Sequence, residues 1–373
     1  MEDWLTVSKM AFSFLKKRIP YDILNNLFDS GMEPESFFTL PTKDILSVLK
    51  IQGDHDFDRL AREEALANAR LEWQKIQKHN IKPLFILDEE YPERLREIYD
   101  APTILYKLGE ADLDPEYSIA LVGTRKPTPY GIEFSKKLVE EISGYFPDAS
   151  IISGLAYGID ATAHKMALEK GLPTVAVVAH GLNMIYPAAN KNLAKQIIRA
   201  GGAILSEYPF DVKPFRGNFL ARNRIVAGLT DVTIVAESPV KGGAMSTANY
   251  AFMYNREVMA LPGRISDEVS AGCNLLIRKN KAHLIGNVAD LIEVTGWRPL
   301  NLNIDPRQRN LFPELEGEAK KIYDFIKSRM TPVSADEIVH SIGIPASKLL
   351  SALNDLEFEG VIVRHPGNRF SAS

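Results

Sequence analysis

Six short apolar runs, rich in β-branched residues, recur between residues 118 and 263 and constrain the fold more than any other feature of the chain. Segments with helical spacing separate the runs. Apolar runs without polar alternation are typical of strands buried on both faces, as in a parallel sheet covered by helices. The sequence therefore predicts an α/β domain with a doubly wound, mostly parallel sheet. The runs are SIALVGTR, ASIISGLA, TVAVVAH, AILSEYP, DVTIVAE and EVMALPG.

The loops that follow three of these predicted strands are rich in glycine and small hydroxyl residues. Open α/β sheets bind ligands at the carboxyl ends of their strands, where the strand order reverses. Glycine lets backbone N–H groups approach an anion at a helix start, and arginine adds a bidentate donor. Three such loops in one domain favour a phosphate site over ordinary tight turns. The candidate residues are Gly123, Thr124 and Arg125, then Ser153 and Gly154, then Lys241, Gly242, Gly243, Ser246 and Thr247.

The segment from Lys213 to Arg224 favours a polymeric ligand over a mononucleotide. It places four cations and two aromatic residues within twelve positions. Cations follow a phosphate backbone while an aromatic ring stacks on an unpaired base, which contributes roughly 1–3 kcal/mol per base. The alternative is that Phe215 and Phe219, spaced i, i+4, are core residues with a solvated cationic flank. The candidate binding residues here are Arg216, Phe219, Arg222, Asn223 and Arg224.

The distribution of charge is compatible with a nucleic-acid ligand. The formal net charge of −4 argues against one by itself. Residues 118–289, however, contain 19 Lys and Arg against 13 Asp and Glu, an excess of +6, so the remainder carries −10. A solvated lysine-rich surface would give the same count, and both interpretations stay open.

Cysteine content and hydropathy indicate a cytoplasmic protein. The single cysteine, Cys273, excludes an internal disulfide and a cysteine-rich zinc site, and a reducing compartment is the simplest setting. The first twenty residues place acids before the first apolar residues, unlike a secretory signal. No run of about 18 apolar residues occurs, so we expect no membrane-spanning segment.

Composition predicts further domains on both sides of the central one. Residues 1–80 form short amphipathic patterns that predict a small helical domain of the SAM or helix-hairpin-helix type. The central domain is expected at 81–295, and a linker rich in Pro, Asn and charge at 296–316. Three helical patterns followed by VIVRHPGNRFSAS predict a winged-helix-like domain at 317–373.

The last predicted domain lacks the basic helix that is expected of a domain that binds duplex DNA. Its third predicted helix, in ASKLLSALNDLEFEG, has one lysine against three acids, whereas a helix in the major groove is expected to be basic. We expect this domain to contact protein or its own chain. Its predicted wing residues Arg364, His365 and Arg369 remain available to a phosphate.

Taken together, these motifs resemble the DNA-processing protein A family, also called DprA or Smf. The resemblance covers residues 91–285 and is specific. It rests on Tyr91-Pro92 with Asp100-Ala101-Pro102, on Gly123-Thr124-Arg125, on Ser153-Gly154-Leu155-Ala156 with Gly158-Ile159-Asp160 and Ala163-His164, on Gly181-Leu182 with Tyr186-Pro187, on Ser206-Glu207-Tyr208-Pro209, and on Arg222-Asn223-Arg224-Ile225-Val226-Ala227-Gly228-Leu229.

The resemblance implies a Rossmann-like domain that binds single-stranded DNA without catalysis, metal or cofactor. It implies that the protein protects DNA taken up in natural transformation and helps to load RecA recombinase. It also implies a homodimer built through the Rossmann-like domain. The DNA pocket would comprise Arg125, Arg216, Phe219, residues 222–224 and residues 241–247.

Two positions depart from the family pattern. The family usually has Phe-Pro where this chain has Phe219-Leu220, so the turn that presents Phe219 is expected to be less rigid. Tyr157 stands where the family often has a basic residue, so one phosphate contact is missing or replaced by stacking.

Three rival functions are weighed against DNA binding. A nucleotide phosphoribohydrolase of the lysine-decarboxylase-like type needs a carboxylate on the helix after the glycine loop, and no Asp or Glu occurs from Ala244 to Asn255. A metal-dependent nuclease would use Asp160 and His164 with Glu207, but a fourth ligand and a base are lacking. A pure interaction scaffold, in which the basic segment is incidental, fits the last domain better than the central one.

Overall fold

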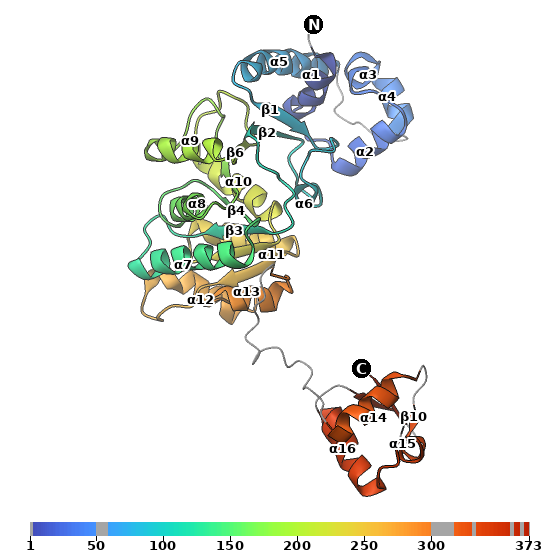
Figure 1. Ribbon diagram of the computed structural model, residues 1–373. Coiled ribbons are helices and arrows are strands. Elements are labelled where there is room, and N and C mark those ends of the chain that lie inside the picture. Colours follow the sequence, from blue (N-terminus) through green and yellow to red (C-terminus); the bar gives the residue numbers. More distant parts are fainter. Residues whose placement is uncertain are drawn as a thin grey trace. The chain divides into compact units, whose positions relative to one another are not determined.

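The computed structural model describes residues 3–49, 59–299, 317–329, 333–358, 362–365 and 369–372. The chain divides into two compact units, Met1–Asn301 and Leu302–Ser373, which are described separately (Figure 1). Most of the predicted linker, residues 300–316, lies outside the described residues. The domain boundaries expected from the sequence at residues 80, 295 and 316 stay predictions.

The first unit is built on a nine-stranded sheet with the order β1-β2-β6-β5-β4-β3-β7-β8-β9. The six predicted runs form β3 to β8, and these six strands pair with one another in parallel, so the predicted doubly wound, mostly parallel sheet is confirmed. Strand β6 also pairs with β2, in antiparallel fashion. Strand order reverses at β3, which lies between β4 and β7. The strands are β1 (Lys82–Phe85), β2 (Ile104–Gly109), β3 (Ser118–Val122), β4 (Ser150–Ser153), β5 (Thr174–Val178), β6 (Ala203–Ser206), β7 (Val232–Val235), β8 (Glu257–Ala260) and β9 (His283–Leu284).

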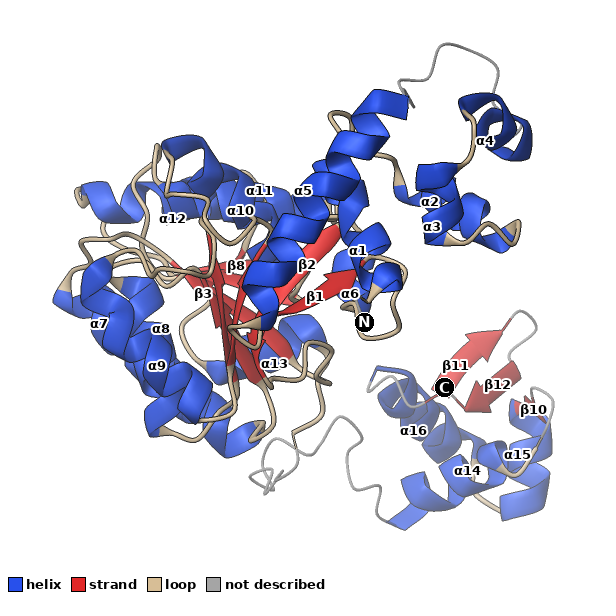
Figure 2. Ribbon diagram, turned by 90° about the horizontal axis from the view of Figure 1, so that it is seen from above, coloured by secondary structure: helices blue, strands red, loops and turns tan. Residues whose placement is uncertain are grey.

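The central strands are buried on both faces because their side chains alternate between two apolar layers. In β3, Ile119 and Leu121 belong to one hydrophobic cluster, whereas Ala120 and Val122 belong to another. Helices α7, α8, α9 and α13 cover one face of the sheet, and α10, α11 and α12 cover the other (Figure 2). Their bounds are α7 (Pro129–Tyr145), α8 (Ile159–Glu169), α9 (Lys191–Arg199), α10 (Arg216–Gly228), α11 (Gly243–Met253), α12 (Ala271–Arg278) and α13 (Val288–Thr295), with 3-10 turns η2 (Ala188–Asn190) and η3 (Glu268–Ser270).

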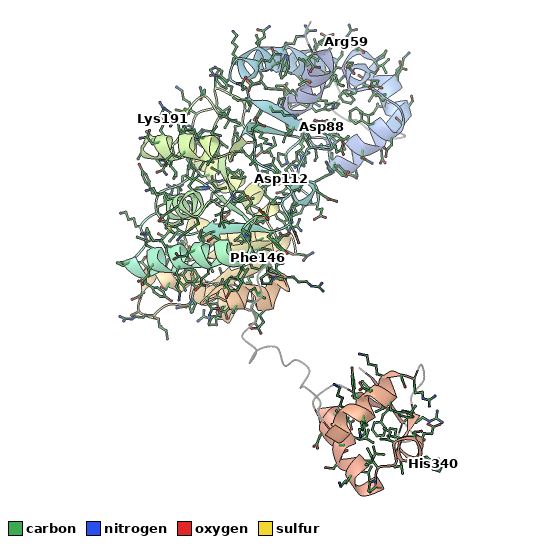
Figure 3. The ribbon with its side chains drawn as sticks, in the orientation of Figure 1. Arg59, Asp88, Asp112, Phe146, Lys191 and His340 are labelled. Atoms are coloured by element: carbon green, nitrogen blue, oxygen red, sulfur yellow. The ribbon has the colours of Figure 1, made fainter. Side chains whose placement is uncertain are left out.

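Phe146, the aromatic residue that directly follows α7 and is labelled in Figure 3, connects the segment after the last helix of the unit to the sheet. Its ring centroid lies 4.9 Å from that of Tyr117 and 5.5 Å from that of Trp297. Asn287 begins α13 with a capping box, in which its side chain accepts hydrogen bonds from the first turn. The segment after the last strand is therefore fixed on the same layer as α7 and α8.

The predicted N-terminal helices pack on the antiparallel edge of the sheet formed by β1 and β2. Phe12 contacts Phe37, Phe38 and Phe85, with ring centroids 4.8, 4.8 and 5.7 Å away, so aromatic packing links these helices to β1. Lys9 pairs with Asp88 at 2.5 Å. The helices are α1 (Trp4–Ala11), α2 (Tyr21–Asp29), α3 (Pro34–Thr39), α4 (Thr42–Leu49) and α5 (Arg59–Gln77), with η1 (Phe12–Phe14) and, between β1 and β2, α6 (Glu93–Arg96).

Helix α5 also contacts the loop that follows β6. The carboxylate of Glu72 accepts a hydrogen bond from Phe210 N at 2.5 Å, and Lys75 pairs with Asp211 at 2.6 Å. The ring of His79 stacks on Phe210 with centroids 4.7 Å apart. The loop that leads toward α10 is thus held from the N-terminal side.

The second unit has the winged-helix type of fold that the sequence predicts. Three helices pack around Ile322, Leu353 and Phe370, and a hairpin follows the third helix. The side chains of two predicted wing residues, Arg364 and His365, lie outside the described residues. The elements are α14 (Gly317–Lys327), β10 (Val333–Ser334), α15 (Ala335–Ile342), α16 (Ala346–Phe358), β11 (Ile362–His365) and β12 (Arg369–Ala372), with sheet order β10-β12-β11.

Candidate nucleic-acid interface

A cavity of about 1020 Å³ lies at the carboxyl ends of β3, β4 and β7, where the strand order reverses. The loops after these strands and the first turns of α10 line it, as expected for a ligand site in an open α/β sheet. The structure brings twelve of the fifteen predicted binding residues together here. They are Gly123, Thr124, Arg125, Gly154, Arg216, Phe219, Arg222, Asn223, Lys241, Gly242, Gly243 and Thr247.

The first loop is held in place by both the backbone oxygen and the buried carboxylate of Glu237, on the loop after β7. Thr124 N donates to Glu237 O at 2.7 Å, and Thr128 N donates to Glu237 Oε2 at 2.8 Å. A β-carbon on Gly123 would lie 2.5 Å from Ile159 Cγ1, so this position requires glycine. The loop is therefore rigid at its base, while the side chain of Arg125 is exposed at its tip.

Arg125 and two aromatic rings form a contiguous group at this cavity. The Arg125 Cζ atom lies 5.4 Å from the centroid of the Phe219 ring, a cation–π arrangement. The Tyr186 ring lies 5.7 Å from the same centroid. Phe219 is partly exposed and Phe215 is 68% exposed, so the alternative that both rings are core residues is not realised.

The second loop depends on a buried carboxylate and a buried guanidinium. Asp160 Oδ2 accepts hydrogen bonds from Gly154 N at 3.2 Å and Ala156 N at 3.3 Å. Arg222 donates to Gly154 O at 2.7 Å and to Val177 O. Burial raises the pKa of the Asp160 carboxyl, although the Arg222 guanidinium acts in the opposite direction. The Arg222 side chain is therefore hydrogen-bonded to backbone oxygens and forms part of the cavity wall.

The third loop opens directly into helix α11. Gly242 occupies the N-cap position without a side-chain hydrogen bond, and Asn223 Nδ2 donates to Gly243 O at 3.2 Å. The first N–H groups of an α-helix lack intrahelical acceptors, and the helix dipole favours an anion there. Lys241 adds an exposed ammonium group. This end of the cavity can bind a phosphate.

Three of the predicted binding residues do not line the cavity. Ser153 is buried and donates to Leu121 O at 2.7 Å. Arg224 pairs with Glu207 at 2.9 Å and with Asp100 at 3.5 Å. Ser246 is half-buried in α11, one residue before the cavity-lining Thr247.

Several cavity residues were missed at the level of sequence. Among them are Lys126, which directly follows the first loop, and Tyr186, which follows β5. The signal for Tyr186 was present, because it belongs to the Tyr186-Pro187 pair already noted. A ring in an irregular loop, however, has no periodicity from which its direction can be predicted.

The metal site of the nuclease alternative does not assemble. Within the described residues, no group of three or more His, Cys, Asp or Glu is placed to hold a metal ion. Asp160 binds backbone amides, and Glu207 pairs with Arg224. The His164 ring lies 2.8 Å from Thr174 Oγ1, and burial lowers its pKa to about 3.

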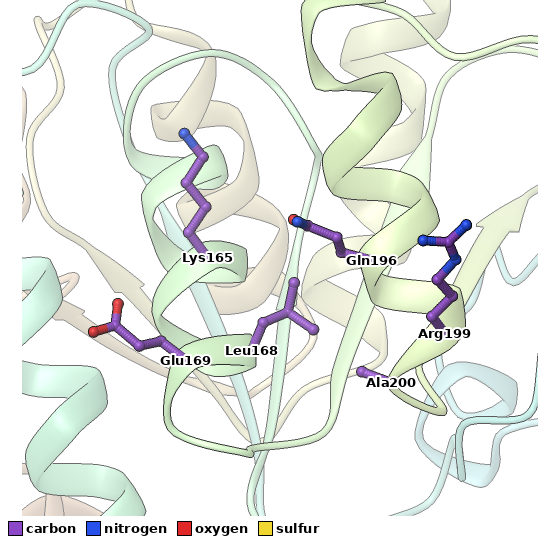
Figure 4. A pocket seen from close by; sticks show the side chains of 6 residues that line it. All are labelled: Lys165, Leu168, Glu169, Gln196, Arg199 and Ala200. Carbon is purple, nitrogen blue, oxygen red and sulfur yellow. The ribbon is translucent and has the colours of Figure 1, made fainter.

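A second hollow, of about 500 Å³, lies between α8 and α9. Lys165 and Glu169 on α8 and Gln196 and Arg199 on α9 line it, and Glu169 points away from α9 (Figure 4). The charges are mixed, and none of the predicted binding residues lines this hollow. The cavity at the strand ends is therefore the better candidate for an anionic ligand.

Comparison with known proteins agrees with this architecture. The family model described as DNA recombination-mediator protein A matches residues 82–296, and that of the DprA winged helix domain matches residues 307–368. Protein Smf from Synechocystis is 36% identical over 80% of this chain and 82% of its own. DNA processing protein DprA from Streptococcus pneumoniae is 40% identical over 56% of this chain and 72% of its own.

Two solved structures are similar in fold and sequence. The X-ray structure of DprA from S. pneumoniae has a TM-score of 0.63 and 31% identity, covering 79% of this chain and 99% of that one. DNA processing protein A from Helicobacter pylori, solved for its single-stranded DNA binding mode, has a TM-score of 0.51 and 36% identity, covering 57% of this chain and 94% of that one. The predicted family is confirmed: this chain belongs to the DNA recombination-mediator protein A family, the DprA or Smf proteins.

Proposed function

We propose that this protein binds single-stranded DNA in the cavity at the ends of β3, β4 and β7. The observation that carries the proposal is the contact of Arg125 with Phe219 at a cavity lined by glycine-rich loops. A guanidinium suits a phosphate and an exposed ring suits an unpaired base, whereas a duplex keeps its bases paired. The solved H. pylori relative, described by its single-stranded DNA binding mode, supports the same ligand.

Each part of the cavity has a separate task in this proposal. Arg125, Arg216 and Lys241 contact phosphates, because their side chains are exposed around the cavity. The free N–H groups at the start of α11 bind a further phosphate oxygen. Phe219 stacks on a base. Arg222 holds the second loop in shape, because its guanidinium donates to backbone oxygens.

We further propose a biological role that follows from membership of the family. The protein takes part in DNA processing during natural transformation, in the cytoplasm, where it protects incoming strands and helps to load RecA onto them without catalysing a reaction. It acts as a homodimer through the Rossmann-like domain. No described helix has the length and apolar character needed to cross a lipid bilayer.

A direct test compares single-stranded and duplex DNA of equal length with the full chain. Fluorescence anisotropy at one fixed salt concentration should give tighter binding of the single strand, because only unpaired bases reach the ring of Phe219. Equal affinity for both ligands would refute the proposal. Incubation of labelled DNA and of nucleoside monophosphates with the protein tests the absence of catalysis, and cleavage above background would contradict it.

A further inference from the structure

We propose that Tyr186 is a second base-stacking residue and that Tyr186 and Phe219 together bind two unpaired bases. This inference rests on the proposed binding of single-stranded DNA. The two rings come from distant parts of the chain, the loop after β5 and the first turn of α10. Both line the same cavity.

The geometry of the pair gives each ring its own ligand face. The ring centroids are 5.7 Å apart and the planes are inclined by 57°. This is the separation of aromatic rings in direct contact, so no base fits between them. Tyr186 is 46% exposed although its ring touches Phe219. Both exposed ring surfaces are therefore covered only if one base stacks on Tyr186 and another on Phe219.

The backbone beneath Tyr186 is fixed by a buried histidine. Tyr186 N donates to His180 Nε2 at 3.1 Å, so Nε2 is unprotonated and Nδ1 carries the proton that is donated to Gly181 O at 2.9 Å. Burial lowers the pKa of His180, which keeps this neutral tautomer near pH 7. A ring held in place before binding loses little conformational freedom when a base stacks on it.

Other exposed aromatic residues near these loops lack this combination. Phe215 is 68% exposed and Tyr157 is 47% exposed, but neither lines the cavity. Tyr186 both lines the cavity and touches Phe219, the ring proposed to stack on a base. It is therefore the ring placed to take the base next to the one on Phe219.

A double-mutant cycle with a short oligothymidylate tests the inference. If Tyr186 stacks on its own base, Tyr186→Ala weakens binding by roughly 5- to 150-fold, and by a similar factor again in the Phe219→Ala background. Tyr186→Phe keeps the ring and should bind like wild type. Tyr145→Ala, at an exposed tyrosine at the end of α7 outside the cavity, is the matched control and should have no effect.

A second measurement identifies the contact directly. An oligonucleotide with 5-iododeoxyuridine at each position in turn is irradiated in complex with the protein, and the adducts are mapped by mass spectrometry. Adducts on both Tyr186 and Phe219 support the inference. An effect of Tyr186→Ala that vanishes in the Phe219→Ala background, together with no adduct on Tyr186, overturns it in favour of a purely positioning role. Failure of the wild-type protein to bind any single strand would instead reject the proposed function itself.

Discussion

Arg224 Nη1 donates to Glu207 Oε2 at 2.9 Å, which joins helix α10 to the loop after β6. The sequence predicts Arg224 as a DNA-binding residue, yet its guanidinium also lies 3.5 Å from Asp100 and does not line the cavity. Arg224 therefore has a structural role, because its buried guanidinium links α10 to the two acidic residues Glu207 and Asp100. Its loss leaves partly buried acids without their cation.

Arg224→Ala is therefore expected to lower stability without removing a phosphate contact. The free energy of unfolding in urea should fall by about 1–3 kcal/mol, because two partly buried carboxylates lose a hydrogen-bonded cation. The salt dependence of DNA binding, measured where the variant is folded, should not change. Lys137→Ala, which breaks the exposed pair with Glu141, is the control and should cost at most about 0.5 kcal/mol. A reduced salt slope for Arg224→Ala would show that Arg224 meets DNA after all.

Arg125→Ala is expected to show the opposite behaviour. The side chain is exposed, so stability should stay within about 0.5 kcal/mol of wild type. The plot of log affinity against log salt should become shallower by about 0.7 for the loss of one contact to a single strand. Arg199→Ala removes the same charge beside the hollow between α8 and α9 and should leave the slope unchanged. An unaltered slope for Arg125→Ala would remove Arg125 from the site.

Gly154→Ala is expected to disturb the cavity from within. A β-carbon there would lie 2.5 Å from Arg222 Nη2, so the buried guanidinium must move. Crowding of this kind costs about 1–3 kcal/mol, and oligothymidylate affinity should fall with it because the second loop shifts. Gly144→Ala is the matched control, because a β-carbon at Gly144 meets no atom within 4 Å. It should raise stability by about 0.5–1 kcal/mol. Equal thermal melting and affinity for Gly154→Ala and wild type would contradict this account.

His164 is expected to make stability depend on pH. Thr174 Oγ1 donates to Ile151 O at 2.7 Å and therefore accepts from His164 Nδ1, while burial lowers the pKa of the ring to about 3. The unfolded chain binds a proton near pH 6.5 and the folded chain does not. Stability is thus fully present above about pH 6.5 and is lost as pH falls toward 3.

The measurement is the free energy of unfolding between pH 7 and pH 4.5 for wild type and His164→Leu. Below pH 6.5 the free energy of unfolding should fall more steeply for wild type than for the variant. The two slopes should differ by up to about 1.4 kcal/mol per pH unit. Comparing slopes isolates His164 from other titrating groups such as His180, which both proteins retain. Parallel curves would mean that His164 is not held neutral by the fold.

The strands and the convergence of the three loops could be predicted from the sequence because both follow from local patterns. Apolar runs such as the one that forms β3 are buried on both faces, and parallel strands bring their carboxyl ends to one edge. The sequence-based prediction was less accurate for the directions in which helical side chains point. Arg222 and Arg224 are two residues apart on α10, so they point about 200° apart and cannot both face one ligand. Helical geometry predicts that only one of the two arginines lines the cavity. Which one does so depends on tertiary packing.

The cavity residue Tyr186 marks the limit of such reasoning. Its contact with Phe219 joins loops that lie far apart in the sequence, and its backbone depends on the buried His180. No spacing rule connects an irregular loop to the helix that it touches. Contacts of this kind follow only from the assembled fold.

The aromatic cluster around Phe12 determines where this protein can be shortened. Phe85 of β1 packs against Phe12, so the apolar layer continues across the boundary predicted at residue 80. Glu72 and Lys75 also hold the loop that leads into α10. A fragment that begins after residue 80 would expose Phe85 to water and release that loop. Such a fragment is expected to self-associate during purification, so the shortest well-behaved version of the sheet unit includes the N-terminal helices.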